Sequence, residues 1–301
     1  MQPWWLDAVC GDDNWQVCLA TNGDGEITGV LPYFLRRKYG LRFILMPPFT
    51  DYIGPLLVYP DKQQGFARQY AFEKQTLGQL IEQLPSFHFF NQQYFPAFDY
   101  WLPFYWRGYH QTTLYTYVID QPQETTVVYE NFKGSVRTDI KKAAAQIEVR
   151  SSEDLETFIR LHRRTLEQQR RLPYPADTLR RLDAALQQRS QRQLLLAFDT
   201  ETATAHAGLY IAYDEQTAYF MLVAIDPSYR RFASLQLLYW EAIQQFSGKV
   251  IRIDFCGSMI EGVERATRAF GAKRIAHYRV YKSANPWLRL LSMILQRGYD
   301  G

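Results

Sequence analysis

Two adjacent arginines, Arg230 and Arg231, precede a predicted helix that extends to about Gly248. The first turn of a helix has unpaired N–H groups and a positive dipole end, and both attract anions. Two positive side chains are mildly unfavourable at that end unless an anion neutralises them. The pair therefore predicts a site for an anionic ligand, and the alternative is a solvated helix start.

A second basic group lies upstream, where four cationic residues fall close together. Its members are Lys133, Arg137, Lys141 and Lys142. Arginine and lysine side chains bind phosphate and carboxylate groups through charge-assisted hydrogen bonds. On the functional interpretation these residues hold a phosphorylated or carboxylated acceptor, and on the other interpretation they form a solvated face.

Asp254 ends a predicted buried strand, where a carboxylate could take a proton from an attacking amine. The alternative is that it caps the turn at Gly257-Ser258, because short aspartate side chains commonly bond the nearby backbone. Tyr219 and Tyr278 lie in predicted strands and are further candidates for moving protons.

Metal and disulfide chemistry are not expected. The three cysteines, Cys10, Cys18 and Cys256, are too few for a disulfide framework and contain no Cys-x-x-Cys pair. This usage indicates a reducing compartment. The five histidines show no ligand spacing, and three of them lie on apolar stretches and are expected in the core: His162, His206 and His277.

No apolar run approaches the roughly 20 residues that span a bilayer. The N-terminus lacks the basic region and apolar core of a signal peptide. We therefore expect a cytoplasmic protein. Two features would suit peripheral membrane contact, namely Trp4-Trp5 and an apolar, arginine-flanked segment at 286–297. The alternative for the second feature is a terminal helix that packs on its own domain.

Charge is distributed unevenly over the 301 residues. Residues 1–132 carry 8 lysines and arginines against 13 acidic residues, whereas residues 133–192 carry 14 against 8. Of the 47 aromatic residues, 29 fall before residue 133. Length and an apolar content of 47% predict two globular domains. DNA binding is not predicted, because the first half is acidic and no aromatic residues interleave with the basic stretch.

Strands and helices alternate clearly in the second half. Apolar runs predict strands at 193–198, 205–213 and 217–224, a helix at 235–246, a strand at 250–255, a helix at 260–270 and a strand at 275–282. Amphipathic helices are predicted before them, at 154–170 and 176–188. The order is α-α-β-β-β-α-β-α-β.

The first half repeats this order more loosely. Strands are predicted at 15–20, 27–36 and 41–46, a helix at 66–84, a strand at 87–90, an aromatic helix-like stretch to Trp106 and a strand at 112–119. A linker is expected at 121–132, between a degenerate domain at 1–120 and a second domain at 133–285. An amphipathic helix is expected at 286–301. The fold class is therefore mixed α/β with two similar domains.

The element order resembles the GNAT (N-acetyltransferase) fold, and two motifs are similar to the Fem (FemABX) family. The first is Lys133-Gly134-Ser135-Val136-Arg137-Thr138-Asp139-Ile140-Lys141-Lys142-Ala143, which resembles Lys-x-x-x-Arg-x-x-Ile-x-Lys-Ala. The second is Asp254-Phe255-Cys256-Gly257-Ser258, followed by Gly262 and by Arg268-Ala269-Phe270-Gly271-Ala272. The resemblance implies two tandem GNAT-like (acyl-CoA N-acyltransferase-fold) domains. It covers residues 127–282 by motif and 1–120 by topology alone.

The chain departs from both patterns. Fem enzymes usually have Phe-Lys where this chain has Ala266-Thr267, and the neighbouring Arg268 is the candidate substitute for that lysine. Nothing in the chain corresponds to the coiled-coil insertion of several tRNA-using members. GNAT enzymes bind the pyrophosphate of CoA on a glycine-rich loop at a helix start, and the matching residues are Arg230-Arg231-Phe232-Ala233-Ser234. Both glycines are replaced, which hinders close approach of the backbone to phosphate.

The resemblance implies a transferase that forms an amide by moving an acyl or aminoacyl group onto an amine of a cell-envelope precursor. Arg230, Arg231, Ala233 and Ser234 would bind the donor, together with Leu222 and Ala224 on the preceding strand. Backbone N–H groups near the strand 219–224 would stabilise an oxyanion. Acyl-CoA or aminoacyl-tRNA is the expected co-substrate, tRNA being the less expected, with no permanent cofactor. The alternative function is a non-catalytic module that binds a sugar or lipid precursor.

Overall fold

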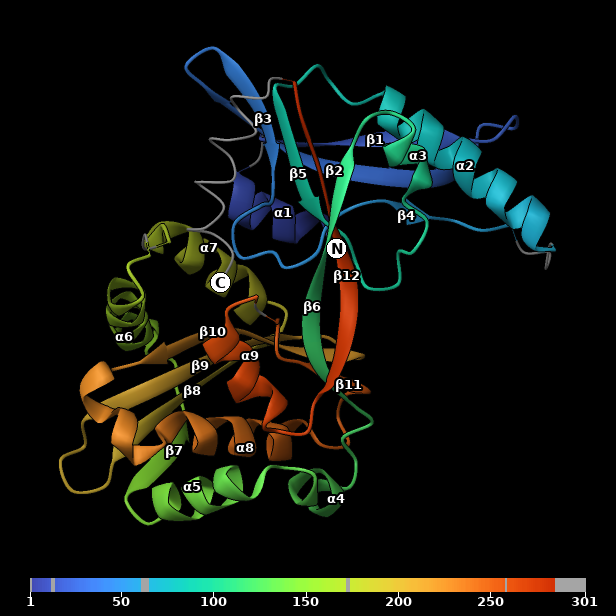
Figure 1. Cartoon of the computed structure of the whole chain (residues 1–301). Coiled ribbons are helices and arrows are strands. Elements are labelled where there is room, and N and C mark those ends of the chain that lie inside the picture. The colour runs from blue at the N-terminus through green and yellow to red at the C-terminus, as the bar shows by residue number, and fades with distance from the viewer. Residues whose placement is uncertain (1, 12–13, 61–64, 172–173, 258, 285–301) are drawn as a thin grey trace. The chain divides into compact units, whose positions relative to one another are not determined.

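The structure, a computed structural model, describes residues 2–11, 14–60, 65–171, 174–257 and 259–284 (Figure 1). The described chain forms two compact units. Of the described residues, the first unit contains those up to Leu114 and residues 276–284, and the second unit contains Tyr115–Ile275. The chain enters the second unit within β6 (His110–Asp120) and returns within β12 (Lys273–Ser283). The predicted limits of the first domain at residue 120, of the linker at residue 132 and of the second domain at residue 285 stay predictions.

The second unit is built on a mixed sheet in the order β7-β8-β9-β10-β11-β6. Its strands are β7 (Ile147–Ser151), β8 (Arg192–Asp199), β9 (Ala205–Tyr213), β10 (Thr217–Ile225), β11 (Arg252–Asp254) and the end of β6. Neighbouring strands are antiparallel, except for β10 and β11, which are parallel. Parallel pairing needs a crossover connection, and α8 (Ser234–Phe246) supplies it.

Helices cover both faces of this sheet. α6 (Leu155–Gln168) and α7 (Ala176–Gln187) lie on one face, and α5 (Gly134–Ala144) and α8 lie on the other (Figure 1). α6 begins at Asp154, whose side chain accepts a hydrogen bond from the Thr157 N–H and so caps the helix. The remaining helices are α4 (Thr125–Glu130), η1 (Pro227–Phe232) and α9 (Glu261–Arg268).

The motif that begins at Lys133 and resembles the Fem pattern folds as α5, a helix that was not predicted from the sequence. Its buried residues are Val136, Ile140 and Ala143, which follow one another at helical spacing. These three residues pack into the core of the second unit, whose centre is formed by fully buried residues such as Leu238 and Ile243 of α8. The motif is therefore an amphipathic helix whose apolar residues face the core, with lysines in its last turn.

The first unit repeats the strand plan, in the order β1-β2-β3-β5-β12. Its strands are β1 (Trp15–Thr21), β2 (Ile27–Lys38), β3 (Leu41–Leu45), β5 (Phe89–Gln93) and the end of β12, with the short β4 (Leu56–Leu57) beside β2. β3 and β5 are parallel, and the other neighbours are antiparallel. The prediction of two tandem GNAT-like domains in a mixed α/β chain is confirmed at the level of topology.

The helices of the first unit are α1 (Pro3–Cys10), α2 (Phe66–Glu82) and α3 (Leu102–Tyr105). α1 was not predicted, and the aromatic stretch before Trp106 contains only the single turn α3. Trp4 and Trp5 are partly buried in α1, and the Trp5 indole donates to the Thr50 hydroxyl at 2.9 Å. The helix predicted at 286–301 lies outside the described residues.

In each unit, the strand beside the second strand of the parallel pair comes from sequence that adjoins the other unit. In the second unit, residues 118–120 of β6 pair with β11. In the first unit, residues 279–283 of β12 pair with β5. If each unit used its own sequence, β6 would complete the first sheet and β12 the second. β6 and β12 have therefore exchanged places between the two units.

Candidate active site

Beyond the point where its pairing with β11 stops, one edge of β10 has no neighbouring strand among the described residues. We call this the free edge, meaning free of strand pairing. The two strands pair only over residues 217–219 and 252–254. The Asp226 N–H donates to the His206 carbonyl of β9, so alternation directs the backbone groups of Leu222 and Ala224 toward β9 as well. The backbone groups of Val223 and Ile225 consequently face the free edge. Leu222 and Ala224, predicted as donor-binding residues, thus lie on this strand, but their backbone N–H and C=O groups face β9 within the sheet.

A β-bulge lies at the point where the free edge begins. The register between β10 and β9 shifts between Phe220 and Leu222, which leaves Met221 without a paired residue on β9. A bulge bends its strand and redirects the neighbouring backbone groups. The Met221 backbone is therefore the part of β10 whose groups are least committed to the sheet.

The chain leaves β10 through η1 and enters α8 at Ala233. Ala233 has φ 54° and ψ 29°, the left-handed conformation that favours glycine. The loop thus keeps the backbone path of a glycine-containing turn although the glycine is replaced. Ser234 follows as the first residue of α8, is 1% exposed, and places its hydroxyl 3.4 Å from Nδ1 of His206.

His206 of β9 packs against the residues of η1 that form this loop. Its imidazole is fully buried and stacks on Tyr229 of η1, with ring centroids 3.9 Å apart. Phe232 packs against the same ring at 4.8 Å. Burial lowers the pKa of His206, although Asp199 and Asp226 oppose this effect, so the ring is neutral and supports the loop by packing.

Arg230 and Arg231 are exposed at the end of η1, and neither has an ion-pair partner among the described residues. Arg231 lies over the Phe232 ring at 4.9 Å. α5 contacts both η1 and α8, and Figure 1 shows that α5 and α8 run in opposite directions. The last turn of α5, with Lys141 and Lys142, therefore lies toward the end of α8 that Arg230 and Arg231 precede.

The other two members of the predicted acceptor group have different surroundings. Lys133 precedes α5, and its backbone N–H donates to the Ala269 carbonyl at 2.8 Å. Arg137 donates from Nη1 to the Glu130 carbonyl at 2.6 Å. The Arg137 guanidinium is thus tied to the chain between α4 and α5, whereas Lys141 and Lys142 are exposed.

Asp254 is 4% exposed, and its carboxylate binds within the protein. Oδ1 accepts a hydrogen bond from the Thr116 hydroxyl at 2.5 Å and another from the Cys256 N–H at 2.8 Å. The Thr116 hydroxyl also accepts from the Gly257 N–H at 3.0 Å. The geometry is that of a turn held by an aspartate, which is the alternative that the sequence left open.

Tyr219 lies next to Asp254, since the two residues are paired across β10 and β11. Burial raises the pKa of Tyr219 to about 12, with a further contribution from Asp214. Arg268 of α9 donates to Glu264 at 2.8 Å, and Glu264 also accepts from the Tyr117 hydroxyl. Tyr278 belongs to the first unit, where its carbonyl accepts from the Tyr94 N–H.

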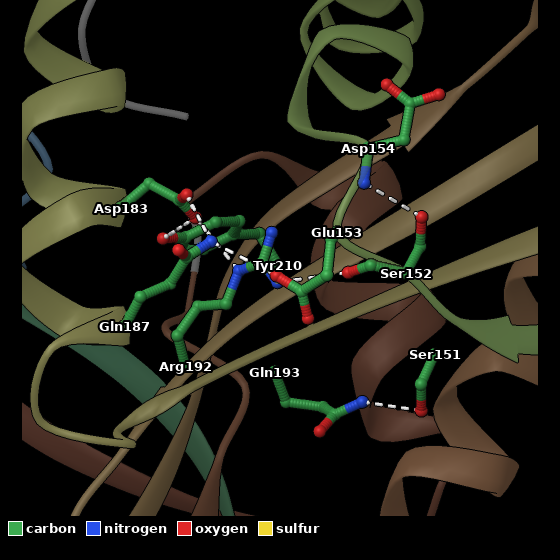
Figure 2. Close-up of polar contacts among 9 residues, drawn as sticks. All are labelled: Ser151, Ser152, Glu153, Asp154, Asp183, Gln187, Arg192, Gln193 and Tyr210. Atoms are coloured by element: carbon green, nitrogen blue, oxygen red, sulfur yellow. Dashed lines mark hydrogen bonds and ion pairs between the residues drawn. The ribbon is translucent and has the colours of Figure 1, made fainter.

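A buried polar network holds α6 and α7 on the sheet (Figure 2). Arg192 donates from Nε to Asp183 at 2.9 Å and from Nη1 to Glu153 at 2.7 Å and to the Ser152 carbonyl at 3.0 Å. The Tyr210 hydroxyl donates to Asp183 at 2.8 Å. The network joins the start of α6, the middle of α7 and strands β8 and β9, so it fixes the helix that flanks the free edge of β10.

Two kinds of site have no counterpart in the described part of the chain. No three metal-binding side chains from His, Cys, Asp or Glu come together there. Among the same residues, no helix combines the length and apolar character that crossing a membrane requires. Burial raises the pKa of Cys10 to about 12 and that of Cys18 to about 11, so neither thiol is an activated nucleophile at neutral pH.

Comparison with known proteins agrees with this architecture. Residues 130–279 match the acetyltransferase (GNAT) domain family. Curated protein sequences give no match. Among solved structures, FemX superposes with a TM-score of 0.62 at 12% identity, over 92% of this chain and 90% of that one.

Two further structures cover nearly the whole chain. The C-terminal domain of a putative lysylphosphatidylglycerol synthetase from Agrobacterium fabrum has a TM-score of 0.57 at 10% identity, over 97% of this chain and 94% of that one. A tandem GNAT protein from the clavulanic acid biosynthesis pathway has a TM-score of 0.55 at 10% identity, over 94% of each. Likeness at this identity establishes the shared fold. Residues 130–279 therefore form an acetyltransferase (GNAT) domain, within a tandem fold that the chain shares with FemX and with the tandem GNAT protein.

Proposed function

We propose that the chain forms an amide by transferring an acyl or aminoacyl group to an amine of a cell-envelope precursor. The observation that carries this proposal is the helix start at Ala233. A left-handed residue, the buried Ser234 at the helix start and the two exposed arginines that precede it together suit the phosphates of a donor, with the lysines of the last turn of α5 on the neighbouring helix. FemX and the lysylphosphatidylglycerol synthetase domain share the fold, and both names support an envelope-related acceptor.

The reaction is direct attack of the amine nitrogen on the carbonyl carbon of an ester or thioester. A C–N bond forms, the C–O or C–S bond breaks, and the proton that the amine loses is balanced by protonation of the leaving group. The backbone N–H groups of Met221 and Val223, on the free edge, are the proposed donors to the oxyanion. Both residues lie within the stretch 219–224 for which this role was predicted.

Tyr219 is the proposed acid that protonates the leaving group. With a pKa of about 12, its phenol stays protonated at neutral pH and can donate, whereas it is a poor base. We leave Asp254 out of the proton transfer, because its carboxylate is buried and accepts hydrogen bonds from Thr116 and Cys256. Arg268 is bound to Glu264 and has no proposed role in the reaction.

A non-catalytic binding module is the second candidate, and one observation favours it. The His162 and Thr165 side chains of α6 bond to backbone groups on the free edge of β10. A protein that only binds a precursor needs no access to this edge. An amide product formed from an acyl donor and an amine would exclude this candidate.

The test is donor binding, measured by thermal shift and native mass spectrometry against acetyl-CoA, longer acyl-CoAs, charged tRNA and UDP-linked sugars. Arg231→Ala should weaken binding of the donor that is found by about five- to tenfold, because it removes one charge-assisted contact to phosphate. Lys249→Ala is the matched control, since it removes one exposed charge beyond the far end of α8. Equal affinity of both variants would place the donor elsewhere.

A further inference from the structure

Side chains of α6 occupy the free edge of β10. Nδ1 of His162 lies 2.9 Å from the Val223 carbonyl oxygen. The Thr165 hydroxyl accepts a hydrogen bond from the Ile225 N–H at 2.7 Å and lies 3.0 Å from the Ile225 carbonyl oxygen. The same hydroxyl also lies 3.1 Å from the Leu161 carbonyl oxygen, so its one proton is shared between two carbonyls. Val223 and Ile225 are the two residues whose backbone groups face this edge, so side chains of one helix contact three of their four polar groups.

These contacts are buried. Thr165 is 5% exposed and His162 is 9% exposed. Burial lowers the pKa of His162, so the neutral ring presents Nδ1–H to the Val223 carbonyl. A buried backbone group that loses its partner is costly, and these bonds therefore hold α6 against the strand.

A third side chain of the same helix is attached to the loop that follows β10. Arg164 forms an ion pair with Asp226, and Asp226 caps η1 by accepting from the Ser228 N–H at 3.0 Å. α6 thus contacts both the strand edge and the first residues of the proposed phosphate-binding loop. Its three contacting residues are His162, Arg164 and Thr165.

An exposed strand edge is where an extended ligand binds, because amide groups along such a ligand can pair with the backbone. The pantetheine arm of CoA carries two amide groups and is a ligand of this kind. We infer that His162 and Thr165 determine donor choice by withholding the Val223 carbonyl and the Ile225 backbone groups from any extended, amide-bearing arm, so that the donor is held through its phosphates and its reacting carbonyl. This inference rests on the proposed function, since it assumes that a donor binds beside α8.

The experiment compares two ligands that differ only in the arm, namely CoA and its nucleotide part, 3′-phospho-ADP. In the wild-type protein, their dissociation constants should agree within about twofold, because the arm finds no backbone partners. In the double variant His162→Ala/Thr165→Ala, CoA should bind about tenfold more tightly than 3′-phospho-ADP, since freed backbone groups can pair with the arm.

Two further variants separate edge closure from a general effect on the fold. Thr165→Ser keeps the hydroxyl and should retain the equal affinities. Thr157→Ala is the control, because Thr157 is buried in the first turn of the same helix and its hydroxyl bonds Arg160. The Ile225 amide should exchange slowly with solvent in the wild-type protein and faster in Thr165→Ala, which confirms that the contact exists in solution.

Each outcome has one meaning. Much tighter binding of CoA than of 3′-phospho-ADP by the wild-type protein would overturn the inference, and so would an unchanged ratio in the double variant. Either result would leave the proposed donor site standing. Absence of binding by both ligands, in the wild-type protein and in the double variant, would instead overturn the proposed donor site, and the inference would fall with it.

Discussion

The two units share a strand plan but treat the end of their parallel pair differently. In the first unit, β3 and β5 pair only at two positions, and the chain that follows β3 then returns to β5. The Ile53 N–H donates to the Gln93 carbonyl at 2.8 Å, and Ile53 is fully buried. In the second unit, side chains of α6 instead meet β10, which corresponds to β3, on the other side of the parallel pair.

This difference indicates which unit is suited to bind a ligand. Main chain that fills the space beside a strand can leave only if a whole segment unfolds. A threonine and a histidine side chain can release the strand by a small displacement of one helix. The first unit is therefore committed to a structural role at this place, and the second unit retains a strand edge that substitution can open.

The largest effect is expected from the side-chain network that holds α6 in the second unit. Asp183→Asn should lower the free energy of unfolding of this unit by about 3–5 kcal/mol, because Arg192 would keep a buried charge without its buried partner. Urea denaturation followed by hydrogen exchange in each unit measures the change. Glu156→Gln, which breaks an exposed pair with Arg180, should cost far less, because solvent screens exposed charges. Similar losses from both variants would contradict this account.

A somewhat smaller effect is expected in the first unit, at the segment that returns to β5. Gly54 has φ 128°, and a Cβ atom there would lie 2.2 Å from Cδ1 of the fully buried Tyr94. Gly54→Ala should destabilise the unit by about 2–4 kcal/mol, through overpacking and backbone strain. Gly25→Ala is the matched control, since Gly25 also has positive φ but no atom within 4 Å of its Cβ position. Equal costs would mean that the segment is loosely packed.

Acid should act on the first unit through His277 of β12. Burial lowers the pKa of His277 to about 4, with a smaller contribution from Arg279. Because the unfolded histidine titrates near about 6.5, its contribution to stability is complete above that pH and is lost as pH falls toward 4.

The expected loss is about 2–3 kcal/mol between pH 7 and pH 4, and His277→Gln should remove it. Thermal unfolding across this range measures the effect. His110→Gln, which removes an exposed histidine of the same unit, should retain the acid dependence. A pH profile unchanged by His277→Gln would show that other groups dominate.

Much of the strand order could be predicted, because β8, β9 and β10 are long apolar runs separated by polar turns. α5 escaped prediction since its apolar positions are only Val136, Ile140 and Ala143 among charged and polar residues. β7 is short and only Ile147 is buried. Short, polar elements depend on tertiary contacts that the sequence does not display.

The helix start could be located from the sequence, but the backbone geometry beside it could not. Arg230 and Arg231 are exposed directly before α8, and their role in binding a donor stays a prediction. The direction of each backbone group on β10 depends on the bulge at Met221, for which the sequence contains no signal. His162 was expected in the core on the basis of its apolar neighbours, and it is buried, but its bond to Val223 depends on how α6 meets the strand.

The exchange of β6 and β12 affects how the protein can be made. The first sheet takes its final strand from residues 279–283, so a ribosome that has released only the first 120 residues has not supplied it. Until residues 279–283 are synthesised, the backbone N–H and C=O groups of β5 that pair with β12 have no strand partner. If the gene were divided near residue 120, the fragment 1–120 would lack β12, which pairs with β5. The fragment from residue 121 onward would lack β6, which pairs with β11. Co-expression of such halves, rather than expression of either alone, is how this protein could be divided and restored.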